Sequence, residues 1–201
     1  MPIELNRQTL KNNPFEQFEL WLQAAQAAGM LHPAAMSVAT ASAAGAVSSR
    51  MMMLRYFDKR GFVFFSSYAT LTARQLDENP QVSLLFPWLA LEKQVKVGGT
   101  AVKIPKTESL RYFASRHKES QMGVWLAHDG GVVSSKALLQ TKLAEIKRKF
   151  REGQVPMPDA WGGYRVAPQT VEFWQGQPDG LHDRFVYVRK DAGWEVSRLM
   201  P

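Results

Sequence analysis

Apolar and polar residues alternate along several short stretches of this chain, as they do in β-strands that bury one face. In the first half of the chain, the stretches with this pattern lie at 36–41, 48–57, 61–67, 81–88 and 92–104. Tight turns separate several of them, and the four residues at 58–61 are the clearest case. Short connections of this kind join antiparallel neighbours, so we expect an antiparallel meander.

Other stretches repeat their apolar residues with the period of a helix. The segment 14–29 begins with Pro14 and ends with Gly29, as a helix does. Its apolar side consists of Phe15, Phe18, Trp21 and Leu22. Further helices are expected at 70–78, 106–115, 119–127 and 134–152. Six or more strands with helices grouped between them predict an α+β fold in one domain, 1–201, whose sheet can close into a barrel. We expect residues 1–13 to form a flexible N-terminal arm.

The last part of the chain predicts further strands around a polar cluster. Strand-like stretches lie at 162–168, 171–176, 183–190 and 194–200. The turn between the second and the third of these contains Gly176, Pro178, Asp179 and Gly180, which predicts a hairpin. Such a hairpin would hold the neighbouring side chains of His182, Asp183, Arg184 and Phe185 close together on a sheet.

The composition is that of a soluble globular protein. Of 201 residues, 45% are apolar and 21% are charged, which is enough for one sizeable core. No apolar run reaches the ~18 residues needed to span a bilayer, and the N-terminal residues lack the apolar centre of a secretory signal. The chain has no cysteine, so neither a disulfide framework nor a thiolate metal site is expected. We therefore expect a cytoplasmic protein with no membrane partner.

A formal net charge of +7 favours anionic partners, and nucleic acid and a phosphorylated small molecule are both candidates. The basic residues are densest at 142–153. Apolar residues in the same stretch recur at helical spacing, so the basic side chains lie mostly on the other face of a helix. A solvated helix face explains this pattern better than a nucleic-acid surface, because no nucleic-acid-binding motif surrounds it. We expect no nucleic-acid partner.

Several common catalytic motifs are missing from the sequence. There is no GxSxG sequence, the four histidines are scattered, and the glycine pairs do not open helices, so no hydrolytic nucleophile, metal site or phosphate loop is predicted. Cationic and polar side chains remain. Arg116 and Lys118 precede Ser120 at an expected helix start, which is a natural anion site. Arg50 and Arg55 lie five apart on one expected strand, so alternation places them on opposite faces unless a bulge intervenes.

A series of motifs, in a fixed order, resembles one family of flavoproteins. The motifs are SSR at 48–50, GFVFFSS at 61–67, NPQVSLLFPWLALEKQV at 79–95, ESLRYFASR at 108–116, SQMGVW at 120–125, VPMPDAWGGYRV at 155–166, VEFWQG at 171–176, LHDRFVYVR at 181–189 and RLMP at 198–201. Together they resemble the pyridoxine/pyridoxamine 5′-phosphate oxidases, the flavin enzymes of vitamin B6 metabolism. The likeness runs from about residue 14 to the last residue without gaps.

The resemblance implies a fold, a cofactor and a set of site residues. The fold is an antiparallel split barrel with peripheral helices, which forms a homodimer with FMN sites at the subunit interface. The implied FMN contacts are Arg50, Met51, Arg55, Phe65, Ser66, Gln94, Trp174 and Arg184. The implied contacts to a small phosphorylated B6 vitamer are Arg55, Tyr112, Arg116, Ser120 and His182. Among these, His182 and Arg184 are the implied catalytic residues, and no metal is involved.

The chain departs from the family pattern at positions that the resemblance assigns to ligands. Where the family has a Ser-Arg-Lys run that grips the FMN phosphate, Leu71 and Thr72 stand in place of the cations. Gly180 replaces the arginine before LHDR, and Asp129 and Gly130 replace a Gln-Ser pair. Loss of two phosphate-directed cations would weaken FMN binding about a hundredfold or more, because hydrogen bonds to charged groups contribute ~1.5–3 kcal/mol each.

The sequence therefore leaves two functions open. The first is FMN-dependent oxidation of pyridoxine or pyridoxamine 5′-phosphate to pyridoxal 5′-phosphate, with oxygen as the acceptor. The second is that of a diverged relative, which binds FMN weakly or not at all and binds pyridoxal 5′-phosphate or another phosphorylated ligand without oxidising it. Leu71 and Thr72 motivate the second function.

Overall fold

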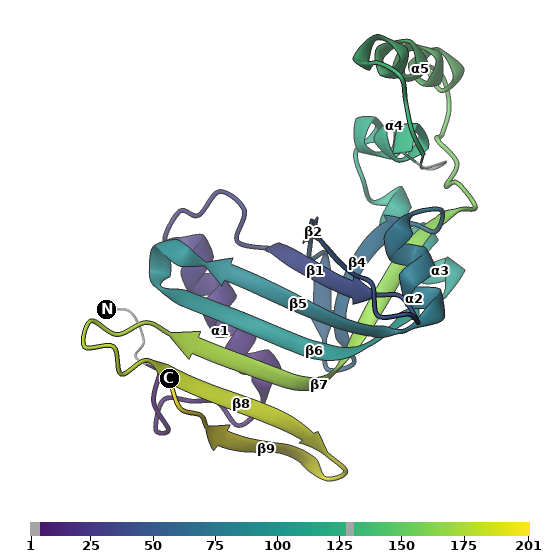
Figure 1. Ribbon diagram of the computed structural model, residues 1–201. Coiled ribbons are helices and arrows are strands. Elements are labelled where there is room, and N and C mark those ends of the chain that lie inside the picture. Colours follow the sequence, from purple (N-terminus) through teal and green to yellow (C-terminus); the bar gives the residue numbers. More distant parts are fainter. Residues whose placement is uncertain (1–4, 128–130) are drawn as a thin grey trace.

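Nine strands form one antiparallel sheet in the part of the chain that the computed structural model describes, residues 5–127 and 131–201 (Figure 1). The strands are β1 (Ala35–Ala41), β2 (Val47–Met53), β3 (Tyr56–Asp58), β4 (Gly61–Ser67), β5 (Gln81–Trp88), β6 (Lys93–Lys103), β7 (Trp161–Gln175), β8 (Asp183–Lys190) and β9 (Gly193–Arg198). Their order is β2-β1-β5-β6-β7-β4-β3, and β8 and β9 continue from β7. The sheet curls into a half-barrel with free edges, so the fold is the α+β split barrel of the resemblance and not a closed barrel.

The long strand β7 connects the two halves of the sheet. It pairs with β6 along most of its length, with β4 through its first part and with β8 through its last part. The sequence predicted two strands here, 162–168 and 171–176, but a single strand of 15 residues runs through both, with a bulge opposite Gly98 and Gly99. A Cβ atom at Gly99 would lie 2.2 Å from the carbonyl oxygen of Ala167, so only glycine permits this close approach.

The expected strand 48–57 is divided in two. β2 ends at Met53, and the chain then leaves β1 for β4, where the amide of Arg55 donates a hydrogen bond to the carbonyl of Val63. Arg55 therefore lies in the joint between β2 and β3. This corrects the expectation that it shares one strand with Arg50, because the change of pairing partner interrupts that strand.

Five α-helices and one short 3₁₀ helix are found among the described residues. They are α1 (Pro14–Ala27), α2 (Leu71–Glu78), η1 (Leu89–Leu91), α3 (Lys106–Ala114), α4 (Lys118–Ala127) and α5 (Lys136–Lys149), and the α-helices agree with the predicted segments to within a few residues. At the start of α1, the side chain of Asn13 accepts a hydrogen bond from the amide of Phe15 at 2.9 Å, and Pro14 occupies the first turn. None of these helices is long and apolar enough to cross a membrane.

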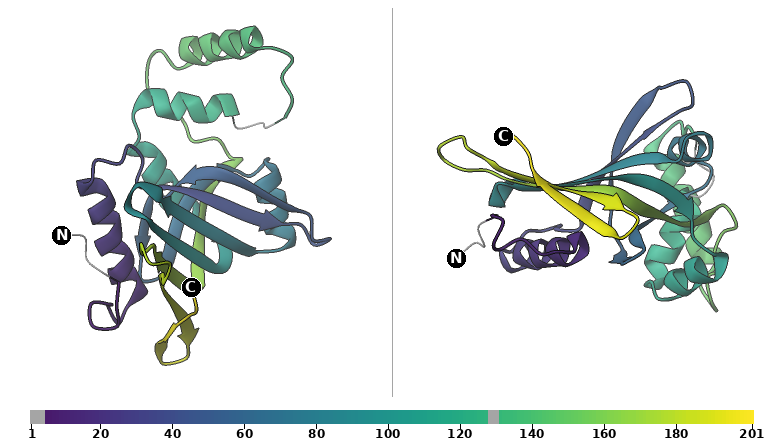
Figure 2. Two further views of the ribbon diagram at one scale, coloured as in Figure 1. Left: turned by 60° about the vertical axis from the view of Figure 1, so that its left-hand side comes forward. Right: turned by 90° about the horizontal axis from the view of Figure 1, so that it is seen from below.

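The apolar side of α1 covers one face of the sheet, and no helix within residues 5–127 and 131–201 covers the other face of the strands beside it (Figure 2). The ring of Phe18 lies 5.0 Å from that of Phe62 and 4.8 Å from that of Phe86, measured between centroids. Trp21 lies 5.2 Å from Phe173 in the same core. All five side chains are buried. Burial of a large apolar side chain contributes roughly 1.5–3 kcal/mol, so α1 is held by its aromatic residues.

Residues 5–13 of the expected N-terminal arm lie against the body of the protein. Leu5 and Leu10 are buried, and the amide of Leu5 donates a hydrogen bond to the side chain of Gln175 on β7. This segment therefore does not extend away from the sheet. Residues 1–4 lie outside the described residues, and the mobility of the arm stays a prediction.

Helices α4 and α5 form a lobe that projects from the sheet (Figure 1). α5 has no fully buried residue, and its half-buried side chains are Leu139, Leu143 and Ile146. The basic residues within 142–153 are all exposed, as a solvated helix face requires. The lobe is tied to the sheet through a second core that contains Phe113, Phe150 and Trp161.

Candidate functional site

A cavity of about 350 Å³ lies among β4, the start of β7, and helices α3 and α4. Its lining includes Arg55, Phe65, Arg116, Ser120 and Trp161. The first four are residues that the sequence assigned to a ligand site, and they come from four separate parts of the chain. Trp161 is an addition that the sequence did not assign. The fold thus brings one part of the predicted site together.

Local structure accounts for the position of each lining residue. Arg55 lies in the joint between β2 and β3, and Phe65 is on β4. Tyr112 and Arg116 are four residues apart, so they occupy one side of α3 and of the link that follows it. Ser120 lies in the first turn of α4. A β-joint, a strand and two successive helices therefore converge on the cavity.

Stacked aromatic rings form one wall of this cavity. The ring of Phe65 lies 4.1 Å from that of Tyr112, with 20° between the planes, and 4.9 Å from that of Trp161, with 19° between the planes. The guanidinium carbon of Arg116 lies 5.6 Å from the centroid of the Trp161 ring, within the range of a cation–π contact. The wall therefore offers flat apolar surface with a cation beside it.

Two arginines supply the charge of the cavity, Arg55 and Arg116. No carboxylate of residues 5–127 or 131–201 forms an ion pair with either guanidinium. Burial lowers the pKa of Arg116, and the positive charge of Arg55 lowers it further, while Tyr112 acts in the opposite direction. Two like charges at one cavity repel each other, so an anion bound between them is favoured.

A charged network stands behind the aromatic wall and joins three elements. Arg165 on β7 donates to Asp58 on β3 at 2.8 Å and to Glu108 on α3 at 2.7 Å. The hydroxyl of Tyr56 also donates to Glu108, at 2.9 Å. Burial and the hydrogen bond to Glu108 raise the pKa of Tyr56 to about 12, so this hydroxyl remains a donor at neutral pH. The network fixes α3, and with it Tyr112, relative to the sheet.

A second group of predicted residues lies at the other end of β7. Gln94, Trp174 and Arg184 are register partners across β6, β7 and β8, so they stand in one row on one face of the sheet. The imidazole of His182 lies 4.8 Å from the Trp174 ring, and its Nδ1 accepts a hydrogen bond from the amide of Gln177. The predicted hairpin is therefore present. Together with the neighbouring strand β6, it holds four of the predicted site residues.

Arg184 is held in place by a buried carboxylate. Its Nε and one terminal nitrogen donate to the two oxygens of Glu172 at 3.0 and 3.1 Å, and Lys96 lies 3.0 Å from the same carboxylate. Burial raises the pKa of Glu172, but the hydrogen bonds from Arg184 and Lys96 outweigh this effect, and the pKa is lowered overall. The hydrogen bond to Glu172 raises the pKa of Arg184. This arginine therefore stays charged and has a fixed orientation.

The two groups of residues lie far apart within one chain. Trp161 borders the cavity, and Trp174 belongs to the second group. The two are thirteen positions apart on the extended strand β7, which corresponds to up to about 40 Å. No contact between the groups is found among the described residues. One copy of the chain therefore does not assemble the whole predicted site.

Arg50 belongs to neither group. Its guanidinium donates to the carbonyl of Val38, to the hydroxyl of Thr40 and to the hydroxyl of Ser48. Both hydroxyls donate in turn to the side-chain oxygen of Gln75 on α2. Burial lowers the pKa of Arg50. The chain's own groups thus already use several donors of this arginine.

The remaining predicted cofactor contacts are close to α2 or exposed. Met51 follows Arg50 on β2, and its side chain is 63% exposed on the opposite face. Ser66 is buried, and its hydroxyl donates to the carbonyl of Ser67 and lies 3.4 Å from that of Thr70. Among the described residues, no hydrogen bond joins Met51 or Ser66 to the aromatic wall.

The altered segment 69–72 forms the start of α2. The side chain of Thr70 accepts a hydrogen bond from the amide of Ala73 and so caps the helix. Leu71 is half exposed and Thr72 is buried. The guanidinium of Arg74 donates to the carbonyl of Ala69, at the surface. Of the other altered positions, Gly180 lies in the turn between β7 and β8 with a φ of 76°, and Asp129 and Gly130 lie outside the described residues.

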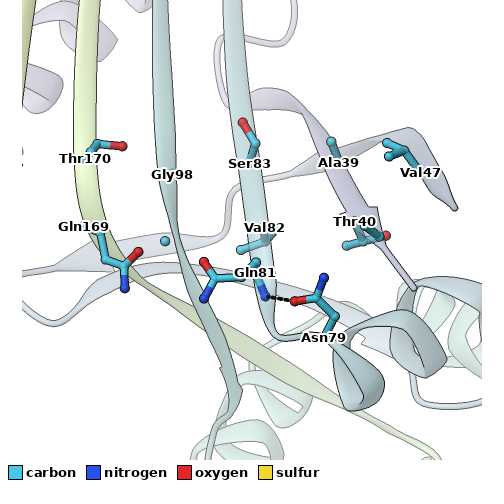
Figure 3. Close-up of a pocket in the computed structure, with 12 residues that line it drawn as sticks. Ala39, Thr40, Val47, Asn79, Gln81, Val82, Ser83, Gly98, Gln169 and Thr170 are labelled. Carbon is cyan, nitrogen blue, oxygen red and sulfur yellow. Dashed lines mark hydrogen bonds between the residues drawn. The ribbon is translucent and has the colours of Figure 1, made fainter. Parts of the chain in front are cut away.

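Another hollow crosses the uncovered face of the sheet. It has a volume of about 330 Å³, and Ala39, Ser83, Gly98 and Thr170 line it as register partners on four neighbouring strands (Figure 3). Its floor is made of small and uncharged residues. It contains none of the predicted site residues, so the charged cavity is the better candidate for a ligand site.

Comparison with known proteins places the chain in a family. Residues 22–150 match the family described as "Pyridoxamine 5′-phosphate oxidase", and residues 161–201 match the "Pyridoxine 5′-phosphate oxidase C-terminal dimerisation region". A pyridoxine/pyridoxamine 5′-phosphate oxidase of Crocosphaera subtropica is 52% identical over 200 residues, which cover 98% of this chain and 94% of that protein. The chain belongs to the pyridoxine/pyridoxamine 5′-phosphate oxidase family.

Further relatives of this oxidase family agree in sequence and in fold. A pyridoxine/pyridoxamine 5′-phosphate oxidase of Aliarcobacter butzleri is 50% identical over 198 residues, which cover 98% of this chain and 93% of that protein. The crystal structure of PhzG from Burkholderia lata, in complex with tetrahydrophenazine-1-carboxylic acid, has a TM-score of 0.92 at 26% identity and covers 99% of this chain and 98% of its own. These matches show the split-barrel fold of the family.

The donor groups of the chain fit part of what this oxidase family requires. FMN carries a flat ring and one phosphate, and a phosphorylated B6 vitamer carries a second phosphate. Phe65 and Trp174 offer aromatic faces, Gln94 offers an amide, and Arg55 and Arg116 form one cation pair without a carboxylate partner among the described residues. A ring and one phosphate therefore fit. For the second phosphate, the altered segment 69–72 contributes no cation and Arg50 is engaged internally.

Three residues shape the site although the sequence assigned them no role. Trp161 is the first residue of the WGGYR motif, and its aromatic side chain was the only hint in the sequence that it could line a ligand site. Glu172 alternates with Trp174 in the EFWQG motif, and this spacing places both on one face of a strand. Gln75 could not be found, because nothing in the sequence shows that α2 packs over Arg50. Contacts between distant elements were the missing information.

Proposed function

We propose that this protein is an FMN-dependent oxidase that converts pyridoxine or pyridoxamine 5′-phosphate to pyridoxal 5′-phosphate, with oxygen as the electron acceptor. The observation that carries the proposal is the pair of arginines, Arg55 and Arg116, at one cavity beside a stacked aromatic wall. A phosphate dianion needs several charge-assisted donors, and two guanidinium groups with the hydroxyl of Ser120 supply them. The curated relatives at about 50% identity carry the name of this activity.

The residues of the cavity have separate roles in this proposal. Arg55, Arg116 and Ser120 hold the substrate phosphate, and the hydroxyl of Tyr112 contributes a further donor. This grip fixes the pyridine ring of the vitamer at a set distance from the phosphate, so that the carbon to be oxidised is oriented before reaction. FMN, when bound, accepts two electrons from the substrate and passes them to oxygen. The chain itself then needs only to position the substrate and to stabilise charge.

His182 and Arg184 act from the second group of residues. The amide of Gln177 donates a hydrogen bond to Nδ1 of His182. Nδ1 is therefore the acceptor, and the neutral imidazole carries its proton on Nε2. His182 therefore donates a hydrogen bond to the ligand through Nε2. Arg184 remains charged beside Glu172 and stabilises negative charge that develops on the bound ring system.

We propose further that a homodimer completes the site. The second group, Gln94, Trp174 and Arg184, lies beside the far end of β7. From there it is too distant to reach a ligand in the cavity of the same chain. A second copy can bring its row of residues to the cavity of the first. The match of residues 161–201 to a dimerisation region supports self-association of this part of the chain. A cytoplasmic location and the absence of a nucleic-acid partner remain predictions of the sequence.

The oxidase proposal is tested with purified protein and added FMN. Oxygen consumption and the absorbance of pyridoxal 5′-phosphate are followed with pyridoxamine 5′-phosphate, pyridoxine 5′-phosphate and, as controls, the two vitamers without phosphate. We expect turnover with the phosphorylated vitamers only. Protein that is inactive at saturating FMN, and that keeps no yellow colour once free FMN is removed, would contradict the oxidase function.

A second function is favoured by one specific observation. The cations expected to hold the FMN phosphate are absent at Leu71 and Thr72, and the donors of Arg50 are directed into the chain. A relative of the oxidases with these changes would bind pyridoxal 5′-phosphate or another phosphorylated ligand in the cavity and oxidise nothing. Separate fluorescence titrations with FMN and with pyridoxal 5′-phosphate distinguish the two functions, because tight FMN binding is expected only of the oxidase.

A further inference from the structure

Trp161 belongs to the second core and also lines the cavity. It is the first residue of β7, paired with Ser67 of β4, and its side chain is almost fully buried. Its ring stacks on Phe65 at 4.9 Å and lies nearly parallel to Tyr112 at 6.4 Å, with 15° between the planes. The guanidinium of Arg116 lies over the same ring. One indole therefore joins β4, β7 and α3 at the edge of the cavity.

Arg116 depends on this ring because it lacks other support. It follows the end of α3, and no described carboxylate or carbonyl accepts a hydrogen bond from its guanidinium. An arginine side chain held at one end only would occupy several rotamers, and fixing it costs conformational entropy. A cation over an aromatic face in a partly desolvated site is restrained by the ring quadrupole. The indole is thus the surface on which the guanidinium rests.

We propose that Trp161 is a positioning residue for anion binding, which holds the guanidinium of Arg116 towards the cavity through its aromatic face. The inference rests on the proposed function in one respect, namely that the cavity binds the phosphate of its ligand. It goes further by assigning part of the phosphate affinity to a residue that contacts Arg116 rather than the phosphate. A tryptophan that served only the second core would contribute to stability alone.

The proposal makes a specific prediction for substitutions at position 161. Trp161→Phe keeps an aromatic face of smaller area, and Trp161→Leu removes the face but keeps an apolar side chain. Cation–π contacts correspond to about two- to thirtyfold in an equilibrium constant, so Trp161→Leu should weaken binding by about tenfold and Trp161→Phe by about two- to threefold. The order of affinity is therefore wild type, then Trp161→Phe, then Trp161→Leu.

The experiment measures equilibrium binding of pyridoxal 5′-phosphate to the full-length protein by its absorbance, with pyridoxal as the probe without phosphate. Each substitution is made alone and together with Arg116→Ala. If Trp161 acts through Arg116, both losses disappear when Arg116→Ala is also present, because the two residues form one coupled unit. Pyridoxal binding should change less than twofold in every Trp161 variant.

Trp194→Leu is the matched control. It removes an indole that lies 5.1 Å from the guanidinium of Arg189, a similar pair that lies on β8 and β9 away from the cavity. This control should leave pyridoxal 5′-phosphate affinity unchanged. Thermal unfolding identifies any variant that does not fold. If Trp161→Leu does not fold, the test rests on Trp161→Phe, whose loss of affinity is compared with and without Arg116→Ala.

Two results would overturn the inference while leaving the proposed function intact. One is an equal loss of affinity with and without Arg116→Ala, and the other is an equal loss in Trp161→Phe and Trp161→Leu. A wild-type protein that binds pyridoxal 5′-phosphate no more tightly than pyridoxal is a different result. It would overturn the proposed phosphate site itself, and the role of Trp161 with it.

Discussion

At the scale of single residues, the carboxylate of Glu172 fixes the orientation of the second group. It accepts hydrogen bonds from Arg184 and from Lys96, and its side chain is 8% exposed. These bonds lower its pKa below the ordinary 4.5, although burial acts in the opposite direction. Because the folded chain has the lower pKa, protonation opposes folding. The stabilisation is therefore complete above about pH 4.5 and is lost as the pH falls through the folded value.

Glu172→Gln tests this assignment by removing the charge and keeping the shape. We expect it to lower the free energy of unfolding at pH 7 by about 1–3 kcal/mol, because two cations lose their charged acceptor. The difference from the wild type should shrink as the pH falls below about 4.5 and through the folded pKa of Glu172, since the wild-type carboxylate then becomes protonated as well. Urea denaturation at a series of pH values measures it. A difference that is constant with pH would show that the charge of Glu172 does not contribute.

Under the proposed function, the absence of cations at Leu71 and Thr72 weakens the hold on the FMN phosphate. We expect Leu71→Arg with Thr72→Lys to raise the affinity for FMN by on the order of a hundredfold, because two charge-assisted hydrogen bonds are gained. Riboflavin has the same ring without the phosphate, and its affinity should not change. Fluorescence titration measures both ligands.

The matched control for this pair is Leu71→Gln with Thr72→Gln, which adds polar side chains of similar length without charge. It should raise FMN affinity by less than the charged variant does, because an amide donates a hydrogen bond to the phosphate but adds no opposite charge. Equal gains for FMN and riboflavin in the charged variant would mean that the flavin phosphate does not lie near the start of α2.

At the scale of secondary-structure elements, the position of α3 depends on the network behind the aromatic wall. Arg165 bridges Asp58 of β3 and Glu108 of α3 and is mostly buried. We expect Arg165→Met to lower the free energy of unfolding by about 1–3 kcal/mol, because Asp58 and Glu108 then lose their buried cation and keep the exposed Arg60 as a partner. Lys106→Met is the matched control on the same helix. Its ion pair with Asp159 is fully exposed, so no measurable change is expected.

Denaturant unfolding at pH 7 compares the two variants. Equal effects of Arg165→Met and Lys106→Met would show that the network does not support α3. A selective loss in Arg165→Met should also weaken ligand binding, because α3 carries Tyr112 and leads into Arg116.

The elements themselves were largely predictable from the sequence, but their junctions were not. Helices α1 to α5 and most strands follow from apolar periodicity and turn residues, since these signals are local. The division of 48–57 into β2 and β3 was missed because it depends on Arg55 pairing with β4, a distant strand. The fusion of 162–168 with 171–176 was missed because the bulge depends on two glycines of β6. Tertiary pairing decided each case.

The site residues follow the same pattern. Arg55, Phe65, Arg116 and Ser120 could be assigned together because the family resemblance carries information about tertiary contacts. The internal hydrogen bonds of Arg50 could not be predicted, because Gln75 approaches it from another element. The sequence also could not show that the predicted residues would separate into two groups, because the distance between the groups depends on how the strands pair.

At the scale of the whole molecule, the proposed homodimer shares each ligand site between two copies of the chain. Arg116→Ala disables the cavity, and Arg184→Gln disables the second group while it keeps a hydrogen bond to Glu172. Each variant alone should be nearly inactive. When the two are co-expressed, about half of the dimers are mixed and each has one intact site, so about a quarter of the wild-type activity should return. Activity no higher than that of the two parents would contradict shared sites.

The central claim is that the cavity between Arg55 and Arg116 binds the phosphate of its ligand. Its most direct measurement is the ratio of the dissociation constants of pyridoxal and pyridoxal 5′-phosphate, for the wild type and for Arg116→Met. We expect the wild type to prefer the phosphorylated vitamer by about tenfold to a hundredfold, and Arg116→Met to lose most of this preference, because charge-assisted hydrogen bonds provide it. Equal affinities of the wild type for the two vitamers would contradict the account.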